Sequence, residues 1–211
     1  MKKTLCAVLI LWSAFPVSWA QKSSPEVSSK FKGGEFITTV KIPFNASENN
    51  IHVTMDRFVS EYKNNLPFLF DWAIEGLKLR GEHDEFIVFN LKSHQYDQAS
   101  NVVKGIMDID VPFLNKENKN VKYKTTLQKR TGENGGYWLK YEMIECDKVI
   151  DHVDALFDIT STGKSEFICI FEAKIRLALP YRLMNMNQYK KNLEWRFAEF
   201  ISNLRDEAER I

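Results

Sequence analysis

The sequence has little of what marks several common classes of protein. Its 211 residues include three cysteines, and 29 Lys and Arg residues are balanced by 28 Asp and Glu residues, for a net charge of +1. No Lys/Arg-rich block interrupts this balance, whereas nucleic-acid-binding domains normally carry a basic stripe. We therefore expect no nucleic acid partner.

Motifs for nucleotide, metal and hydrolytic chemistry are also missing. The histidines lack His-Glu-x-x-His or comparable ligand spacing, and the chain has no Gly-x-Ser-x-Gly elbow. Gly163-Lys164-Ser165 resembles the end of a phosphate loop, but Asp158 stands where that motif needs a glycine, and a strand pattern follows where it needs a helix. We expect a hairpin turn there, with no cofactor and no assignable catalytic residue.

Acidic pairs on the polar side of the predicted strands are the remaining metal candidates. Asp108 and Asp110 share one strand face, as do His152, Asp154 and Asp158. Both groups alternate with apolar residues and lie on the same predicted strand face as lysines, which is typical of charged side chains exposed to solvent. We therefore expect no metal site.

A long apolar run occurs only at the N-terminus. Residues 4–15 (TLCAVLILWSAF) follow Lys2 and Lys3, and small residues stand at Ser18 and Ala20, the −3 and −1 positions of a cleavage site. The run is shorter than the ~20 residues that span a bilayer, and Cys6 stands at its start, where a lipidated cysteine would not. We expect a signal peptide over 1–20, a periplasmic or secreted protein, and no stable membrane insertion after cleavage.

Residues 21–34 (QKSSPEVSSKFKGG) are rich in Ser and Lys and predict a flexible leader, which leaves one domain over 35–211. Cleavage after Ala20 would leave 27 basic and 28 acidic side chains, together with Cys146 and Cys169. An exported protein could join the two cysteines. Strand alternation places them on opposite faces of one sheet, which favours free thiols.

The rest of the chain predicts an α+β order. A strand over 35–44 precedes two short helices, 53–64 and 68–80, which are separated at Pro67. Six more strands and a long final helix follow, with a polar loop through His94 and Tyr96, a turn over 115–120 and an Asn134-Gly135 hairpin. The predicted strands cover 86–91, 102–113, 121–130, 137–146, 152–160 and 167–179, and the helix covers 183–211.

Alternation through these strands places apolar residues at odd positions and charged residues at even positions. Successive side chains of a strand point to opposite faces, so the sheet is antiparallel with one apolar and one polar face. The final helix carries an apolar stripe at helical spacing, with Trp195 on the opposite side. The stripe residues are Met186, Tyr189, Leu193, Phe197, Phe200, Ile201, Leu204 and Ala208.

This order of elements resembles the START-like helix-grip superfamily, which includes lipid-transfer proteins, the birch-pollen-allergen group and polyketide cyclases. The resemblance covers about residues 35–211 in topology and pattern, and it carries no catalytic position over to this chain. It implies a curved seven-stranded antiparallel sheet that wraps around the C-terminal helix, with the two short helices closing one end and an internal cavity.

The apolar residues at odd positions of the predicted strands include several Met and aromatic residues. Met is conformationally adaptable and Tyr is amphipathic, so both suit a cavity that binds a hydrophobic ligand with a polar end. We predict non-catalytic binding of a hydrophobic or amphipathic, lipid-like molecule, oriented by Tyr123 or Tyr141. The alternatives are a cyclase or hydrolase in the same cavity, or a cell-envelope protein-interaction module whose core is filled. The predicted ligand contacts are Met107, Tyr123, Tyr141, Met143, Phe157, Phe171, Tyr189 and Phe197.

Overall fold

The computed structural model describes residues 23–73, 88–111, 116–179, 181–183 and 186–211. The predicted signal peptide, the end of the predicted helix 68–80 and the start of the predicted strand 86–91 lie outside these residues.

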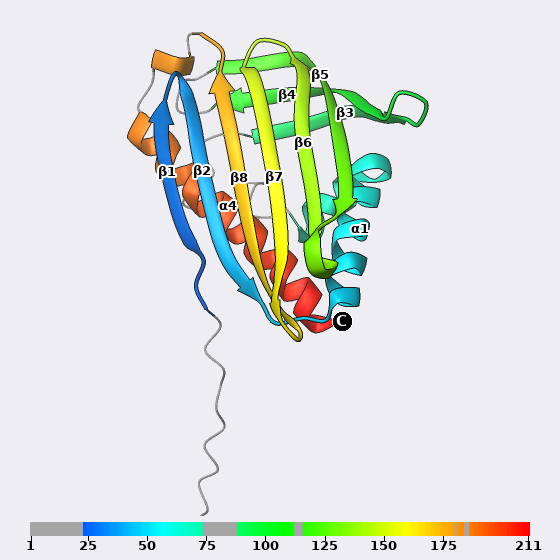
Figure 1. Cartoon of the computed structure of the whole chain (residues 1–211). Coiled ribbons are helices and arrows are strands. Elements are labelled where there is room, and N and C mark those ends of the chain that lie inside the picture. Colours follow the sequence, from blue (N-terminus) through cyan, green and yellow to red (C-terminus); the bar gives the residue numbers. More distant parts are fainter. Residues whose placement is uncertain (1–22, 74–87, 112–115, 180, 184–185) are drawn as a thin grey trace, which may run out of the picture.

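Eight antiparallel strands form one sheet in the order β1-β2-β8-β7-β6-β5-β4-β3. The sheet bends strongly, so that β4 crosses the upper part of the view while β6, β7 and β8 run down it (Figure 1). The α+β prediction of a curved antiparallel sheet is confirmed. The strands are β1 (Glu26–Lys32), β2 (Glu35–Phe44), β3 (Val88–Asp97), β4 (Val102–Val111), β5 (Lys116–Thr131), β6 (Tyr137–Cys146), β7 (Ile150–Gly163) and β8 (Glu166–Leu177).

The additional strand is β1, which lies in the segment predicted to be a flexible leader. It pairs with β2 along its whole length, and Val27 lies opposite Val40. Ser29 is hydrogen-bonded to Thr38 at 2.8 Å, and the rings of Phe31 and Phe36 lie 5.0 Å apart. The Ser/Lys-rich composition obscured a two-residue alternation, so the seven-strand prediction was one strand short.

Three α-helices lie in the described residues, together with two 3-10 helices, Glu133–Gly135 and Tyr181–Leu183. α1 (Glu48–Asn64) begins five residues earlier than predicted, because Ser47 caps it by accepting the Asn50 N–H at 3.1 Å. α2 (Leu66–Trp72) carries Pro67 in its first turn, where the missing N–H costs no helical hydrogen bond. α4 (Met186–Arg210) runs along the concave side of the sheet and contacts β1, β2 and α1 (Figure 1).

The apolar stripe of α4 faces the sheet as predicted from Tyr189 to Ala208, and the side chain of Met186 lies outside the described part of the chain. Leu193 and Phe197 are half-buried, and Trp195 on the other side is exposed. Burial of each large side chain contributes roughly 1.5–3 kcal/mol, so packing holds this helix more than propensity does. The fully buried stripe residues are Tyr189, Phe200, Ile201, Leu204 and Ala208.

Irregularities in the strand pairing change which face some side chains occupy. The register shifts between Leu91 and Ser93, so the predicted polar loop is part of β3, and His94 lies opposite Gly105. A second shift makes Ile144 an extra residue of β6, so Cys146 lies opposite Tyr123. A β-bulge inserts one residue and reverses the alternation beyond it. Both bulges therefore bring side chains of even number to the inner face.

Cys146 and Cys169 are free thiols. The prediction that they occupy opposite faces was wrong, because the bulge at Ile144 turns Cys146 inward. They remain unpaired for another reason. Tyr141 lies level with Ala173, and the two cysteines extend from this pair in opposite directions along β6 and β8. At ~3.3 Å per residue they are about 25 Å apart, far beyond disulfide reach.

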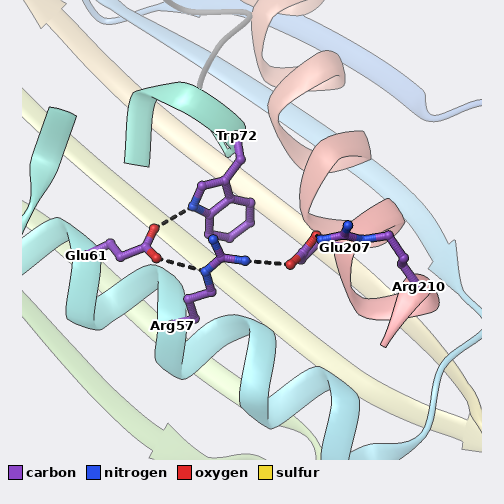
Figure 2. A network of polar contacts seen from close by, with 5 residues as sticks. All are labelled: Arg57, Glu61, Trp72, Glu207 and Arg210. Atoms are coloured by element: carbon purple, nitrogen blue, oxygen red, sulfur yellow. Dashed lines mark hydrogen bonds and ion pairs between the residues drawn. The ribbon is translucent and has the colours of Figure 1, made fainter. Parts of the chain in front are cut away.

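A polar network joins the three helices (Figure 2). Arg57 of α1 donates to Glu61 at 2.8 Å and to Glu207 of α4 at 2.5 Å. The Trp72 indole N–H of α2 donates to Glu61 at 2.5 Å, and the Arg57 guanidinium lies 4.5 Å from the centre of the Trp72 ring. One arginine therefore fixes α2 and α4 to the same side of α1. Among the described residues, no helix is both long and apolar enough to cross a bilayer.

Candidate functional site

Two clusters of buried apolar side chains lie between the sheet and the helices. The first has an aromatic centre, in which the Phe157 and Phe171 rings lie 4.8 Å apart and Phe200 meets both. The second contains Phe36 and Tyr189, whose ring centres are 5.8 Å apart. The clusters occupy opposite ends of the same elements. On α4, for example, Tyr189 belongs to the second cluster and Phe200 to the first.

Between the clusters, the inner face carries a band of apolar side chains that are only half-buried. On β8 the order is Ala173 of the first cluster, half-buried Ile175 and then Leu177 of the second. The same order recurs on β7 and on α4. We call these residues the inner-face band: Met107, Tyr141, Met143, Val153, Ala155, Ile175, Leu193 and Phe197. Apolar side chains in this position that water still reaches are the lining that a hydrophobic ligand would cover.

Polar side chains gather beside this band. The His94 imidazole is hydrogen-bonded through Nδ1 to the Tyr123 hydroxyl at 2.7 Å and through Nε2 to the Tyr62 carbonyl at 2.6 Å. The Tyr62 hydroxyl meets the Thr125 hydroxyl and the Tyr141 side chain. We call Tyr62, His94, Tyr123, Thr125 and Tyr141 the Tyr–His cluster.

Burial keeps the Tyr–His cluster uncharged near neutral pH. It raises the pKa of Tyr62 to about 12 and also raises the pKa values of Tyr123 and Tyr141 above that of a free phenol. It lowers the pKa of His94, because desolvation disfavours the imidazolium. In a neutral imidazole one nitrogen donates and the other accepts. Nε2–H donates to the Tyr62 carbonyl, so Nδ1 accepts the proton of the Tyr123 hydroxyl and leaves the phenol oxygen able to accept another bond.

Gly105 makes the contact between Tyr123 and His94 possible. A Cβ at this position would lie 2.4 Å from the Ser93 carbonyl oxygen and 2.5 Å from the Tyr123 hydroxyl oxygen, closer than real Cβ atoms approach. The absence of a side chain therefore creates the space in which the Tyr123 hydroxyl reaches across β4 to His94 on β3.

The predicted ligand contacts fall into three groups. Met107, Tyr141, Met143 and Phe197 lie in the inner-face band. Phe157 and Phe171 are fully buried in the first cluster and Tyr189 in the second. Tyr123 is also buried, with its hydroxyl on His94.

Three residues of the Tyr–His cluster, Tyr62, His94 and Thr125, were not among the predicted contacts. Tyr62 stands in a helix, and His94 stood in a segment interpreted as a loop. The alternation of His94 and Tyr96 was the available signal, but the bulge before Ser93 shifted it out of phase with the preceding strand. Among the described residues, no group of three His, Cys, Asp or Glu side chains could hold a metal ion.

Comparison with known proteins bears on the fold. No protein-family model and no curated protein matches this sequence. The lipid transfer and protein localization domain of human StarD13 superposes with a TM-score of 0.50 at 11% identity, over 90% of this chain and 86% of that one. The chain has the START-like helix-grip fold.

Other solved structures align over most of their lengths at lower scores. A START superfamily protein from Mycobacterium smegmatis has 12% identity and a TM-score of 0.42, over 82% of this chain and 97% of that one. The Zhui aromatase/cyclase from Streptomyces sp. R1128 has 7% identity and a TM-score of 0.47, over 83% of this chain and 94% of that one.

Proposed function

We propose that this protein binds a hydrophobic or amphipathic small molecule, without catalysis, between the inner face of the sheet and α4. The observation that carries the proposal is the inner-face band, whose apolar side chains remain half-buried between two closed clusters. The StarD13 domain, named for lipid transfer, has the same helix-grip fold. The driving force would be the apolar area removed from water, at about 25 cal/mol per Å².

The Tyr–His cluster defines the polar end of the ligand. Its groups are uncharged near neutral pH, so a ligand carboxylate would lose its hydration without gaining a cation. A ligand hydroxyl would instead donate a hydrogen bond to the Tyr123 phenol oxygen, whose own proton is held by His94. We therefore propose a lipid-like ligand with a neutral polar end, such as a sterol or a long-chain alcohol.

A variant that fills the band tests this proposal. Ala155 lies in the inner-face band beside Tyr141, so Ala155→Trp should occupy the space that the ligand needs. Leu156 is its neighbour on the outer face, and Leu156→Trp is the matched control. Native mass spectrometry should show a long-chain alcohol or sterol bound to the parent and to the control, but not to Ala155→Trp. No adduct on the parent with either probe, or equal adducts on both variants, would overturn the proposal.

We also propose that the chain is exported and cleaved after Ala20. Support comes from Lys2 and Lys3, the short apolar run and the small residues at Ser18 and Ala20. N-terminal sequencing of the secreted or periplasmic protein should begin at Gln21, and Met1 on the exported protein would contradict the proposal.

One observation favours an enzyme as the second candidate. His94, a neutral imidazole that touches Tyr123, adds a titratable group to a site whose sequence offered only tyrosines and a cysteine. A cyclase or hydrolase would use such a pair for proton transfer. If a substrate is found, His94→Gln and Tyr141→Phe should abolish turnover while substrate binding persists. Turnover that survives both changes would remove this candidate.

A further inference from the structure

The outer face of the sheet carries a hollow that the proposed ligand site does not use. It has a volume of about 410 Å³ and lies over β3, β4 and β5, with one residue from β6. Three lysines on its rim are exposed, and all belong to β4 or β5. The lining residues are Ser93, Gln95, Lys104, Gly105, Ile106, Lys122, Tyr123, Lys124 and Glu145.

The charged side chains around this outer hollow include a like-charge pair that destabilises the sheet. Lys104 on β4 lies directly opposite Lys124 on β5, and like charges in such a cross-strand pair are destabilising. Glu145 on β6 lies on the other side of Lys124 and binds its ammonium at 2.5 Å. Lys104 and Lys122 form no salt bridge with any described residue. The hollow therefore carries a local charge of about +2, in a chain whose total is +1.

We propose that the outer hollow binds a phosphate group, presented by a small phosphorylated molecule or by a lipid headgroup. Lys104 and Lys122 supply two ammonium groups for a dianion, and a bound phosphate removes the repulsion between Lys104 and Lys124. Ser93 and Gln95 are exposed at the same place and offer hydroxyl and amide donors. The volume falls within the roughly 300–1,000 Å³ that is usual for small-molecule sites.

This inference goes beyond the proposed function because the outer hollow lies on the polar face, opposite the inner-face band. The result for one site does not decide the other. A ligand found between the sheet and α4 leaves the outer hollow to be tested separately with its own probes.

The test compares two variants that each remove two charges. Lys104→Gln/Lys122→Gln alters the outer hollow, and Lys30→Gln/Lys164→Gln removes two exposed lysines from β1 and from the turn between β7 and β8. NMR titration measures binding of free phosphate, with inorganic phosphate replacing chloride at constant ionic strength. Co-sedimentation with phosphatidylcholine vesicles, with and without phosphatidic acid, reports on a headgroup phosphate.

The parent should bind at least one probe saturably, with amide shifts centred on residues 104–106 and 122–124. The first variant should bind about tenfold more weakly or worse, because two charge-assisted contacts are lost, and the second should match the parent. Binding to phosphate alone identifies a free ligand, and lysine-dependent binding to phosphatidic acid vesicles identifies a headgroup. The inference is overturned if neither probe binds or if the two variants bind equally.

Discussion

Replacement of Arg57 by Met should destabilise the protein by about 2–3 kcal/mol. The change keeps an apolar stem and removes the charge-assisted hydrogen bonds to Glu61 and Glu207, each worth about 1.5–3 kcal/mol in a protected setting. The Arg57 side chain is about one-third exposed, so screening reduces this sum. Both carboxylates are about nine-tenths buried and lose a cation, although Trp72 and Arg210 still donate to them.

For a chain of this length the loss corresponds to a fall in Tm of roughly 4–12 °C. Urea unfolding and calorimetry measure it. Arg57→Lys is the informative control, because it keeps the charge but loses the planar fork and the stacking on Trp72, and it should lose at least half as much. In a double-mutant cycle with Glu207→Gln, the coupling energy should reach about 1 kcal/mol or more. An Arg57→Met protein within about 0.5 kcal/mol of the parent would refute the reasoning.

Three further changes test the core and the Tyr–His cluster. Phe197→Asp replaces a ring whose centre lies 5.0 Å from that of Phe171 by a carboxylate and should prevent cooperative folding, so a soluble protein with a sharp thermal transition would contradict it. Gly105→Ala should cost about 1–3 kcal/mol by urea unfolding, because its Cβ clashes with the Ser93 carbonyl and the Tyr123 hydroxyl, and an unchanged midpoint would count against this. The His94 pKa is lowered in the folded state, so the unfolded chain binds more protons below pH ~6.5, and stability should fall as the pH falls through that value. His94→Gln should flatten this slope, and an unaltered slope would assign it to other groups.

The fold followed from sequence wherever alternation was regular. The predicted strands over 35–44 and 137–146 match β2 and β6 to the residue, and the stripe of the last helix faces the sheet. In each of these elements the same apolar periodicity continues over many residues, so the local secondary-structure preference agrees with the tertiary packing. The prediction of β1 failed because Ser, Lys and Pro are typical of linkers, while the pairing of that strand with β2 is a tertiary contact.

The candidate site was less predictable, because irregularities in the sheet build it. Met107, Tyr141, Met143 and Phe197 could be assigned to the inner face by counting residues along strand and helix. His94 could not, since the bulge before Ser93 reverses the count. Nothing in the local sequence around Lys92 marks a bulge, as the extra residue depends on how β3 pairs with β4.

The same bulges explain how His94 and Cys146 reach the inner face of the sheet. In a regular strand, the alternation that places Leu91 on the inner face would direct His94 to solvent, where its side chain would pay no desolvation penalty. The extra residue brings His94 inward, and its desolvation is offset by bonds to Tyr123 and to the Tyr62 carbonyl. A second bulge, at Ile144, brings Cys146 to the same face opposite Tyr123. His94 and Cys146 thus reach the level of the inner-face band through backbone irregularity, so deletion of Lys92 should restore regular pairing and remove His94 from the site. We expect a folded deletion variant to retain the sheet and, by native mass spectrometry, to bind a sterol or long-chain alcohol more weakly than the parent, because His94 no longer orients the Tyr123 hydroxyl.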